Sequence, residues 1–298
     1  MMKKNDLLDQ FYKKRKSLIT KLFFLAILVP FFTIALFKMS KQEQFIAKIR
    51  IEGIIQDRED IINQIDGLID NENVKGLISV VNSPGGTFVG SKEIYDSIKS
   101  LSEKIPTVVY MREMATSGGY LVSLSSDKIY GNTGTITGSV GVILQTADIT
   151  ELLGKIGINP VIVKSGELKA VPNPAEKVNE DKLIYLENII QKMQKEFLDI
   201  VKSDRDVKES IIRDVSDGRI LTGREAKNLK LIDALGNEKD ALAWLKKEAG
   251  VEEDIKIKDL SLQKDLSSIL DLTFLKKKIN YFNQNFYNGF FAIWTPGI

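Results

Sequence analysis

The feature that most constrains the fold is an alternation of apolar runs with amphipathic segments between Phe45 and Gly166. Val74–Val81 and Thr107–Met111 are rich in apolar residues and have strand length, as strands buried on both faces of a sheet do. Arg58–Asp70 and Thr87–Lys104 show the apolar spacing of helices. This order of strands and helices predicts an α/β fold with a mainly parallel sheet and flanking helices.

Further segments extend this pattern. Phe45–Ile55 and Lys128–Tyr130 are expected as strands, and Asn179–Asp204 has the apolar stripe of a long amphipathic helix. Shorter helices are expected after it, near Val207–Asp214, Gly223–Leu229 and Asn237–Glu248. The body of the protein is therefore expected over residues 45–250.

The N-terminal segment predicts a membrane anchor. Leu22–Phe37 is a run of 16 uncharged residues, and residues 17–37 together reach the roughly 20 that cross a bilayer. Seven lysines and arginines but only two aspartates lie within residues 1–21, which places the N-terminus in the cytoplasm by the positive-inside rule. A cleaved signal peptide is the alternative, but no small-residue cleavage site follows Phe37. We expect a cytoplasmic tail, a transmembrane helix in the inner membrane and a linker over residues 1–16, 17–37 and 38–44.

This topology places the body in the periplasm or outside the cell. Acidic residues outnumber basic ones after residue 21, which argues against binding to nucleic acid. The C-terminal extension, residues 251–298, differs in composition, because eight aromatic residues lie between Asp271 and Ile298. Two interpretations stay open for it: a helix lying on the lipid bilayer, or a helix packed on the body or on a neighbouring subunit.

Missing residue types limit the chemistry. The chain has no histidine and no cysteine, which excludes Ser-His-Asp triads, cysteine nucleophiles and zinc sites built on these ligands. Ser117-Gly118-Gly119 nevertheless stands between a predicted strand and a short predicted helix, as a nucleophile turn does. Such a turn presents the serine hydroxyl and the Gly118 amide to an acyl group. An ordinary Ser-Gly-Gly loop is the alternative.

A second glycine motif, Ser83-Pro84-Gly85-Gly86-Thr87, follows another buried strand and precedes a helix. Backbone amides at such a junction can bind an anion. A phosphate loop would continue with Gly-Lys-Ser or Gly-Lys-Thr, which is missing here. A site for a coenzyme A ester stays open. Two such motifs at neighbouring strand ends favour an oxyanion hole.

Without histidine, a lysine is the obvious general base. Its pKa must then fall from about 10.4 to near 7–8, and removal from water is the main way to achieve this. Lys169 follows an expected strand, Val161–Val163, and is flanked by apolar residues from Leu168 to Pro172. The chain has 42 lysines and arginines, so other candidates remain on this argument alone.

Five motifs together resemble the short form of the signal peptide peptidase A family. They occur in the order Asn82–Gly86, Ala115–Tyr120, Thr137–Val142, Ser165–Lys169 and Asp217–Ala226, and the resemblance covers about Phe45–Gly250. Members of this family are membrane-anchored serine proteases with a Ser-Lys dyad and a Clp/crotonase-like fold. The resemblance implies that this chain degrades remnant signal peptides at the membrane without a metal or organic cofactor.

The resemblance also implies roles for individual residues. Ser117 is the expected nucleophile and Lys169 the general base, while Gly86 and Gly118 supply the oxyanion-hole amides. Ser139 is expected to orient the lysine amine. The family further implies a homo-oligomer in which Ser117 and Lys169 of neighbouring chains meet.

The chain departs from the family pattern at Thr116 and Leu121, where alanine and tyrosine are common, so its side-chain preference stays open. Asp217–Ala226 is expected to be structural. Two other functions stay open as alternatives: a crotonase-type acyl-CoA enzyme and a non-catalytic scaffold.

Overall fold

In a computed structural model of the protein, the described residues are 26, 43–56, 58–262 and 291–293. The chain divides into two units, Met1–Gln44 and Phe45–Ile298, and the fold described below is that of the second unit. The predicted tail and anchor lie outside the described residues except for Ala26, which is helical. Within the described ranges, no helix is long and apolar enough to cross a membrane.

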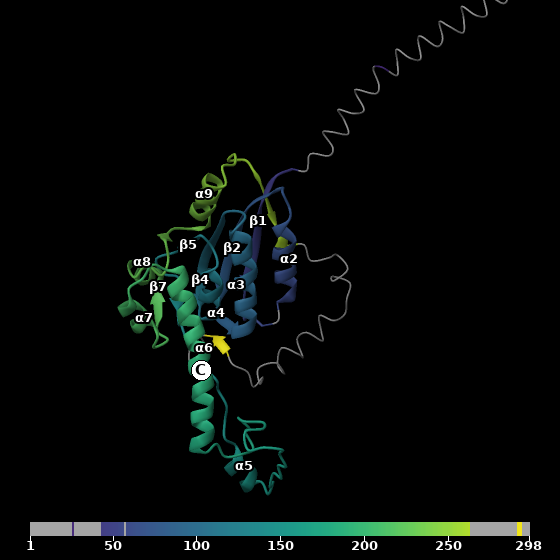
Figure 1. The fold of residues 1–298 in the computed structure, drawn as a ribbon, viewed down its shortest axis with the longest axis vertical. Helices are drawn as coiled ribbons and strands as arrows, with labels where there is room; N and C mark the ends of the chain where they lie inside the picture. The colour runs from purple at the N-terminus through teal and green to yellow at the C-terminus, as the bar shows by residue number, and fades with distance from the viewer. Residues whose placement is uncertain (1–25, 27–42, 57, 263–290, 294–298) are drawn as a thin grey trace, which may run out of the picture. The chain divides into compact units, whose positions relative to one another are not determined.

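The second unit is built on one mixed sheet. Its strands are β1 (Phe45–Glu52), β2 (Val74–Ser83), β4 (Thr107–Thr116), β5 (Lys128–Gly131), β6 (Ile136–Gly138), β7 (Ile220–Thr222), β8 (Ala234–Leu235) and β9 (Lys256–Asp259). Among the described residues these eight strands follow the order β7-β6-β4-β2-β1-β9, with β5 joined to β4 and β8 to β5 (Figure 1). Only β6 and β7 pair antiparallel within this sheet. The predicted α/β fold with a mainly parallel sheet is confirmed.

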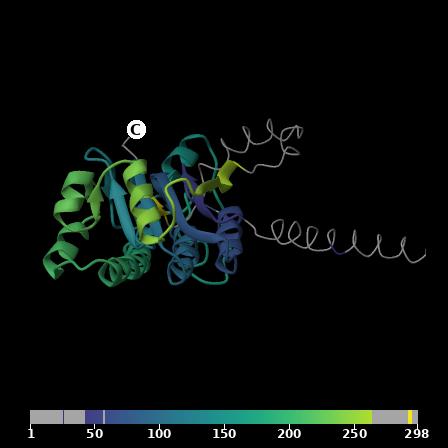
Figure 2. The same cartoon turned by 90° about the horizontal axis from the view of Figure 1, so that it is seen from above.

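Helices cover both faces of the sheet (Figure 2). They are α2 (Glu59–Ile69), α3 (Phe88–Ser102), α4 (Gly118–Ser123), α5 (Thr150–Lys155), α6 (Glu180–Asp204), α7 (Glu209–Val215), α8 (Gly223–Asn228) and α9 (Glu238–Glu248). Successive residues of a strand face opposite sides, so β1 contributes to two cores. Ala47 and Ile49 belong to the larger core with α2, α3 and α4, whereas Ile46 packs in a smaller core with Ala241 and Leu245 of α9.

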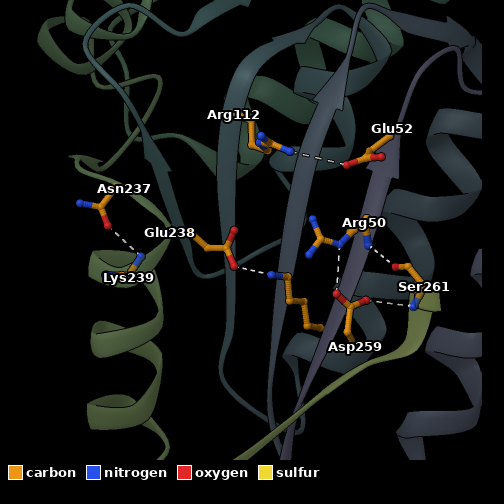
Figure 3. Close-up of polar contacts among 9 residues, drawn as sticks. Arg50, Glu52, Arg112, Asn237, Glu238, Lys239, Asp259 and Ser261 are labelled. Atoms are coloured by element: carbon orange, nitrogen blue, oxygen red, sulfur yellow. Dashed lines mark hydrogen bonds and ion pairs between the residues drawn. The ribbon is translucent and has the colours of Figure 1, made fainter. Parts of the chain in front are cut away.

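The sheet continues beyond residue 250, where the sequence suggested a separate extension. β9 pairs parallel with β1. Arg50 Nε lies 3.0 Å from Asp259 Oδ2, and the Arg50 amide donates to Ser261 Oγ at 2.7 Å (Figure 3). Lys48 forms an ion pair with Glu238 at the start of α9. These contacts attach β9 and the start of α9 to the same strand, β1.

A long projection, which we call the arm, comprises residues 143–179 and the first turns of α6. Figure 1 shows α5 at the end of α6 that lies away from the sheet. No residue of α5 is buried. The predicted strand Val161–Val163 is wrong, because these residues have no strand partner in the described part of the chain. Val161 and Val163 are 89% and 92% exposed, so the apolar run marks a surface rather than a sheet.

Further along the C-terminal extension, in its aromatic-rich part, residues 291–293 form a short strand, β10 (Phe291–Ile293), drawn in yellow in Figure 1. It pairs antiparallel with β3 (Gly85–Thr87), a three-residue strand between β2 and α3. The expectation of a helix is therefore wrong for these three residues, because their backbone groups pair with a neighbouring strand. The other aromatic residues of the extension lie outside the described ranges.

Candidate active site

Ser117 occupies a strained turn between β4 and α4. Its φ of 54° and ψ of −117° lie in a region that residues other than glycine rarely adopt. Such a conformation costs roughly 1–3 kcal/mol and persists only where the surroundings enforce it. Here the Ser117 amide donates to the Gly138 carbonyl at 2.8 Å, and the hydroxyl lies 3.4 Å from the Gly141 carbonyl. The predicted nucleophile turn is thus present in geometry, and Ser117 is 1% exposed.

The two glycines after Ser117 let α4 approach β2. A Cβ atom on Gly119 would lie 2.8 Å from the Ser83 carbonyl oxygen, closer than side chains tolerate. Gly118 is the first residue of α4, so its amide has no acceptor within the helix. Tyr120, which follows the two glycines, is fully buried, and its hydroxyl donates to the Leu231 carbonyl at 3.0 Å. Close packing and this bond hold the start of α4 in place.

The second glycine motif is built beside this turn. Ser83 Oγ donates to the Gly53 carbonyl at 2.6 Å and accepts from the Gly85 amide at 3.0 Å. The Ile55 amide donates to Gly85 at 2.8 Å, and the Thr87 amide donates to Ile55 at 2.7 Å. Alternate residues of a strand direct their amides to opposite edges. The Gly86 amide therefore faces away from Ile55, toward the other edge of β3.

Gly86 has no room for a side chain. A Cβ atom there would lie 1.6 Å from the Ile55 carbonyl oxygen. Together with the α4 packing on Ser83, this close approach brings the predicted oxyanion donors Gly86 and Gly118 into one corner of the molecule, at the carboxyl ends of β2 and β4. The arrangement provides two amides next to a strained serine, as stabilisation of a tetrahedral oxyanion requires.

Ser139 belongs to the same corner. Gly138 and Ser139 have φ values of 80° and 53°, and the Ser139 amide donates to the Arg219 carbonyl at 2.8 Å. The Arg219 amide in turn donates to the Asp217 carboxylate at 3.0 Å. The sequence analysis assigns no catalytic role to the Asp-Gly-Arg motif, which it expects to be structural. In the structure its turn supports the backbone of Ser139, which lies next to the residue that accepts from Ser117.

Lys169 lies apart from this corner within one chain. Its side chain is exposed, and its amide donates to the Gly166 carbonyl at 3.0 Å. No hydrogen bond or ion pair of its side chain occurs among the described residues. The neighbouring Leu168 is 46% exposed. The expected apolar shield around Lys169 is therefore missing in a single chain, although Ser117, Gly118, Gly86 and Ser139 come together.

Two other lysines of the arm are already paired. Glu176 forms ion pairs with Lys164 and Lys182, whose side chains are 13% and 9% exposed. The hydrogen bond from Lys164, followed by that from Lys182, holds the pKa of the Glu176 carboxyl below its ordinary value. Since each ammonium is bound to a carboxylate, neither is suited to accept a proton from Ser117. Within the described residues, no group of three or more acidic side chains could hold a metal ion.

The sequence of the chain matches two known protein families. The profile of peptidase family S49 matches residues 99–252, and that of Clp protease matches residues 41–147. The chain belongs to peptidase family S49. It is therefore a serine protease, and the Clp match agrees with its mainly parallel α/β sheet.

Three relatives of this S49 peptidase illustrate the match. A candidate protease, slr0021, of Synechocystis sp. is 34% identical over 220 residues, which cover 73% of this chain and 79% of the relative. A candidate signal peptide peptidase SppA of Enterococcus faecium is 31% identical, with 68% and 63% covered. Protease 4 of Haemophilus influenzae is 29% identical, with 73% and 37% covered. The chain thus spans less than two thirds of the last two relatives.

Proposed function

We propose that this S49 peptidase is a membrane-anchored endopeptidase that cleaves remnant signal peptides, with Ser117 as nucleophile and Lys169 of a neighbouring copy as general base. The observation that carries the proposal is the positive φ of Ser117 between the Gly86 and Gly118 amides. Strain of this kind at a buried serine is expected where function requires a fixed hydroxyl.

The chemistry follows from these roles. Lys169 removes the proton of the Ser117 hydroxyl, whose oxygen attacks a peptide carbonyl carbon. The carbonyl oxygen gains negative charge and accepts hydrogen bonds from the Gly86 and Gly118 amides. Lys169 then protonates the leaving amine, and water hydrolyses the acyl-enzyme, which restores Ser117. Ser139 accepts from or donates to the lysine amine and so orients it.

The arm supports a site shared between copies. Val161, Val163 and Ile156 are 89%, 92% and 61% exposed on one projection. Surfaces of this kind mark contacts with a partner or a membrane. If a neighbouring copy covers the arm, Lys169 leaves water, and loss of hydration lowers a lysine pKa toward the range of a general base. The homo-oligomer thus supplies the apolar shield that is missing from one chain.

The substrate class rests on two supports. The sequence predicts an anchor over residues 17–37, which would keep the site near the bilayer where cleaved signal peptides remain. A relative at 31% identity carries the name signal peptide peptidase. The predicted topology, with the N-terminus in the cytoplasm and the body in the periplasm or outside the cell, is part of the same proposal.

The test uses the full chain, purified in detergent, and a fluorogenic peptide with the apolar sequence of a signal peptide. Ser117→Ala and Lys169→Ala should each lower kcat/KM at least about a thousandfold. Lys177→Ala, which changes another exposed lysine of the arm, is the matched control and should retain activity. The wild-type rate should rise with pH through an apparent pKa well below the value of about 10.4 for free lysine.

Mixing the two inactive variants distinguishes a shared site from one formed within a chain. Random mixing of Ser117→Ala and Lys169→Ala copies leaves about one site in four with both groups, so about a quarter of the activity should return. No recovery after subunit exchange would place both groups in one chain. Equal activity of both variants and the wild type would reject the Ser-Lys mechanism.

A further inference from the structure

The loop that carries Lys169 is closed by an ion pair between its two ends. Lys164, which precedes Lys169, binds the carboxylate of Glu176, which follows it. The same carboxylate also binds Lys182 in the first turn of α6. Lys169 therefore lies in a loop whose two ends meet at one carboxylate.

The backbone around Glu176 is itself held in place. The Glu176 amide donates to the Asn173 carbonyl at 3.0 Å, and the Asn173 side chain accepts from the Ala175 amide at 3.0 Å. The Ile149 amide, at the start of α5, donates to the Pro174 carbonyl at 2.9 Å. Because these bonds fix its backbone, Glu176 is a stable attachment point for the other end of the loop.

That other end depends on Lys164. Within residues 159–165, all of which the structure describes, the ion pair of Lys164 is the only hydrogen bond or ion pair. Lys164 Nζ and Glu176 Oε2 are both shielded from solvent. A shielded charge is costly without its partner, so loss of the Glu176 carboxylate should move the Lys164 ammonium toward water and release this end of the loop.

Backbone strain lies directly beside Lys169. Ala170 has a φ of 60°, in the left-handed region that residues other than glycine rarely adopt. Among the described residues, only three others that are not glycine have a positive φ: Ser117, Ser139 and Lys230. The first two of these belong to the candidate active site. Such strain persists only where surrounding contacts enforce it, and closure of the loop supplies such a contact here.

We propose that Glu176 is a positioning residue, which holds Lys169 in place for the reaction. By joining Lys164 to Lys182, its carboxylate fixes the loop before a neighbouring copy docks. The inference rests on the proposed function, because it takes Lys169 as the general base. A base acts only within hydrogen-bond reach of the proton, and a displacement of about 1 Å can lower a rate about a hundredfold.

Steady-state kinetics of the full chain in detergent, with the fluorogenic peptide, test this role. Glu176→Gln keeps the shape of the side chain and removes its charge, so kcat should fall at least about tenfold while KM changes less than about twofold. Glu151→Gln, at an exposed carboxylate of α5, is the matched control and should resemble the wild type. Lys164→Met added to Glu176→Gln should cause no further loss, because both changes break one contact.

Mixed assemblies show whether Glu176 acts through the lysine or through the general stability of the arm. When Ser117→Ala and Lys169→Ala copies are mixed, each active site takes its lysine from a Ser117→Ala copy. Glu176→Gln placed in the Ser117→Ala copies should lower the recovered activity at least about tenfold, whereas the same change in the Lys169→Ala copies should alter it less than about twofold. A purely structural role would make the two placements equal, since both mixtures contain the same number of altered arms.

The outcomes separate the two proposals. Absence of peptidase activity in the wild type, or equal rates with and without Lys169, would reject the proposed function and this inference with it. A loss with Lys169→Ala but none with Glu176→Gln would overturn the inference alone. Equal losses for the two placements, or a smaller oligomer of Glu176→Gln in sedimentation, would also overturn it. A fall in kcat confined to the copies that supply the lysine supports it.

Discussion

The corner that contains Ser117 is tightly packed, whereas the arm that contains Lys169 is largely exposed. In the corner, Ser117, Gly86 and Ser139 are fixed by backbone hydrogen bonds and by contacts too close for a Cβ atom. In the arm, α5 has no buried residue and Val163 is 92% exposed. One half of the proposed catalytic apparatus is complete within a chain, whereas the other half exposes the surface that an interior would bury.

This difference shows where each part obtains its stability. The positive φ of Ser117 requires the body to oppose the strain, and the body does so with buried hydrogen bonds. In the arm, α5 buries no residue, so the apolar surface of the arm would be covered only in the proposed assembly. Assembly would then complete the active site and cover the arm in a single step.

The largest effect should come from a methyl group in the corner. Gly86→Ala places a Cβ atom 1.6 Å from the Ile55 carbonyl oxygen, so β3 or Ile55 must move. We expect a loss of unfolding free energy at or above the roughly 1–3 kcal/mol of overpacking, with loss of peptidase activity. Gly154→Ala in α5 is the matched control, because no atom lies within 4 Å of its added Cβ. Chemical denaturation measures both variants, and equal stability would contradict the comparison.

The next effect concerns assembly rather than folding. Val161→Asp places a carboxylate on the arm at a residue that is 89% exposed, so the unfolding free energy of one chain should change by no more than about 0.5 kcal/mol. Burial of the same charge between copies should weaken association at least tenfold, or about 1.4 kcal/mol, with loss of activity. Val161→Thr, similar in shape but uncharged, is the control. Sedimentation in detergent measures the association, and an unchanged oligomer would show that the arm contacts something else.

The same contrast explains how much of the fold could be predicted. Strands such as Val74–Val81 and the helix after Asn179 follow from local periodicity, and burial in the body agrees with it. Val161–Val163 has the same apolar composition, but a strand needs a neighbour, and composition does not reveal one. The sequence of Val161–Val163 therefore predicts a strand that the structure does not contain.

The candidate site divides in the same way. Ser117, Gly118, Gly86 and Ser139 lie on turns that their own glycines permit, so motifs locate them. In the proposed function, the position of Lys169 relative to Ser117 depends on contacts between copies, and local sequence motifs do not specify such contacts. The pairing of β10 with β3 could not be predicted from the sequence. About 200 residues separate the two strands, and no local pattern indicates which strand pairs with the edge of β3.

A smaller effect tests the support under α4. The Tyr120 hydroxyl donates to the Leu231 carbonyl at 3.0 Å inside the core, and burial raises the pKa of Tyr120 further above neutral pH. Tyr120→Phe removes this bond and leaves a buried carbonyl unpaired, so we expect a loss of about 1–3 kcal/mol in unfolding free energy. Tyr185→Phe, at an exposed position of α6, should change nothing. Denaturant titration compares them, and equal midpoints would mean that water replaces the lost hydroxyl.

The smallest effect concerns the order within the arm. Lys164 and Lys182 lower the pKa of the Glu176 carboxyl, so the folded form favours the ionised group. The resulting stabilisation is present above the unfolded pKa of about 4.3 and is lost as the pH falls through the lower folded value. Glu176→Gln should therefore speed hydrogen exchange of fragments covering residues 164–182 by a few-fold at pH 6.

The difference between the two proteins should shrink as the pH falls toward 3, because Glu176 of the wild type loses its charge as the pH falls through its lowered folded pKa. Comparison at one pH cancels the intrinsic dependence of exchange on acidity, and fragments of β2 serve as the internal control because that strand lies in the body. A difference that persists undiminished at pH 3 would show that the shape of the side chain, rather than its charge, orders the arm. A smaller difference at pH 3 would show that the charge of Glu176 stabilises the local structure of residues 164–182.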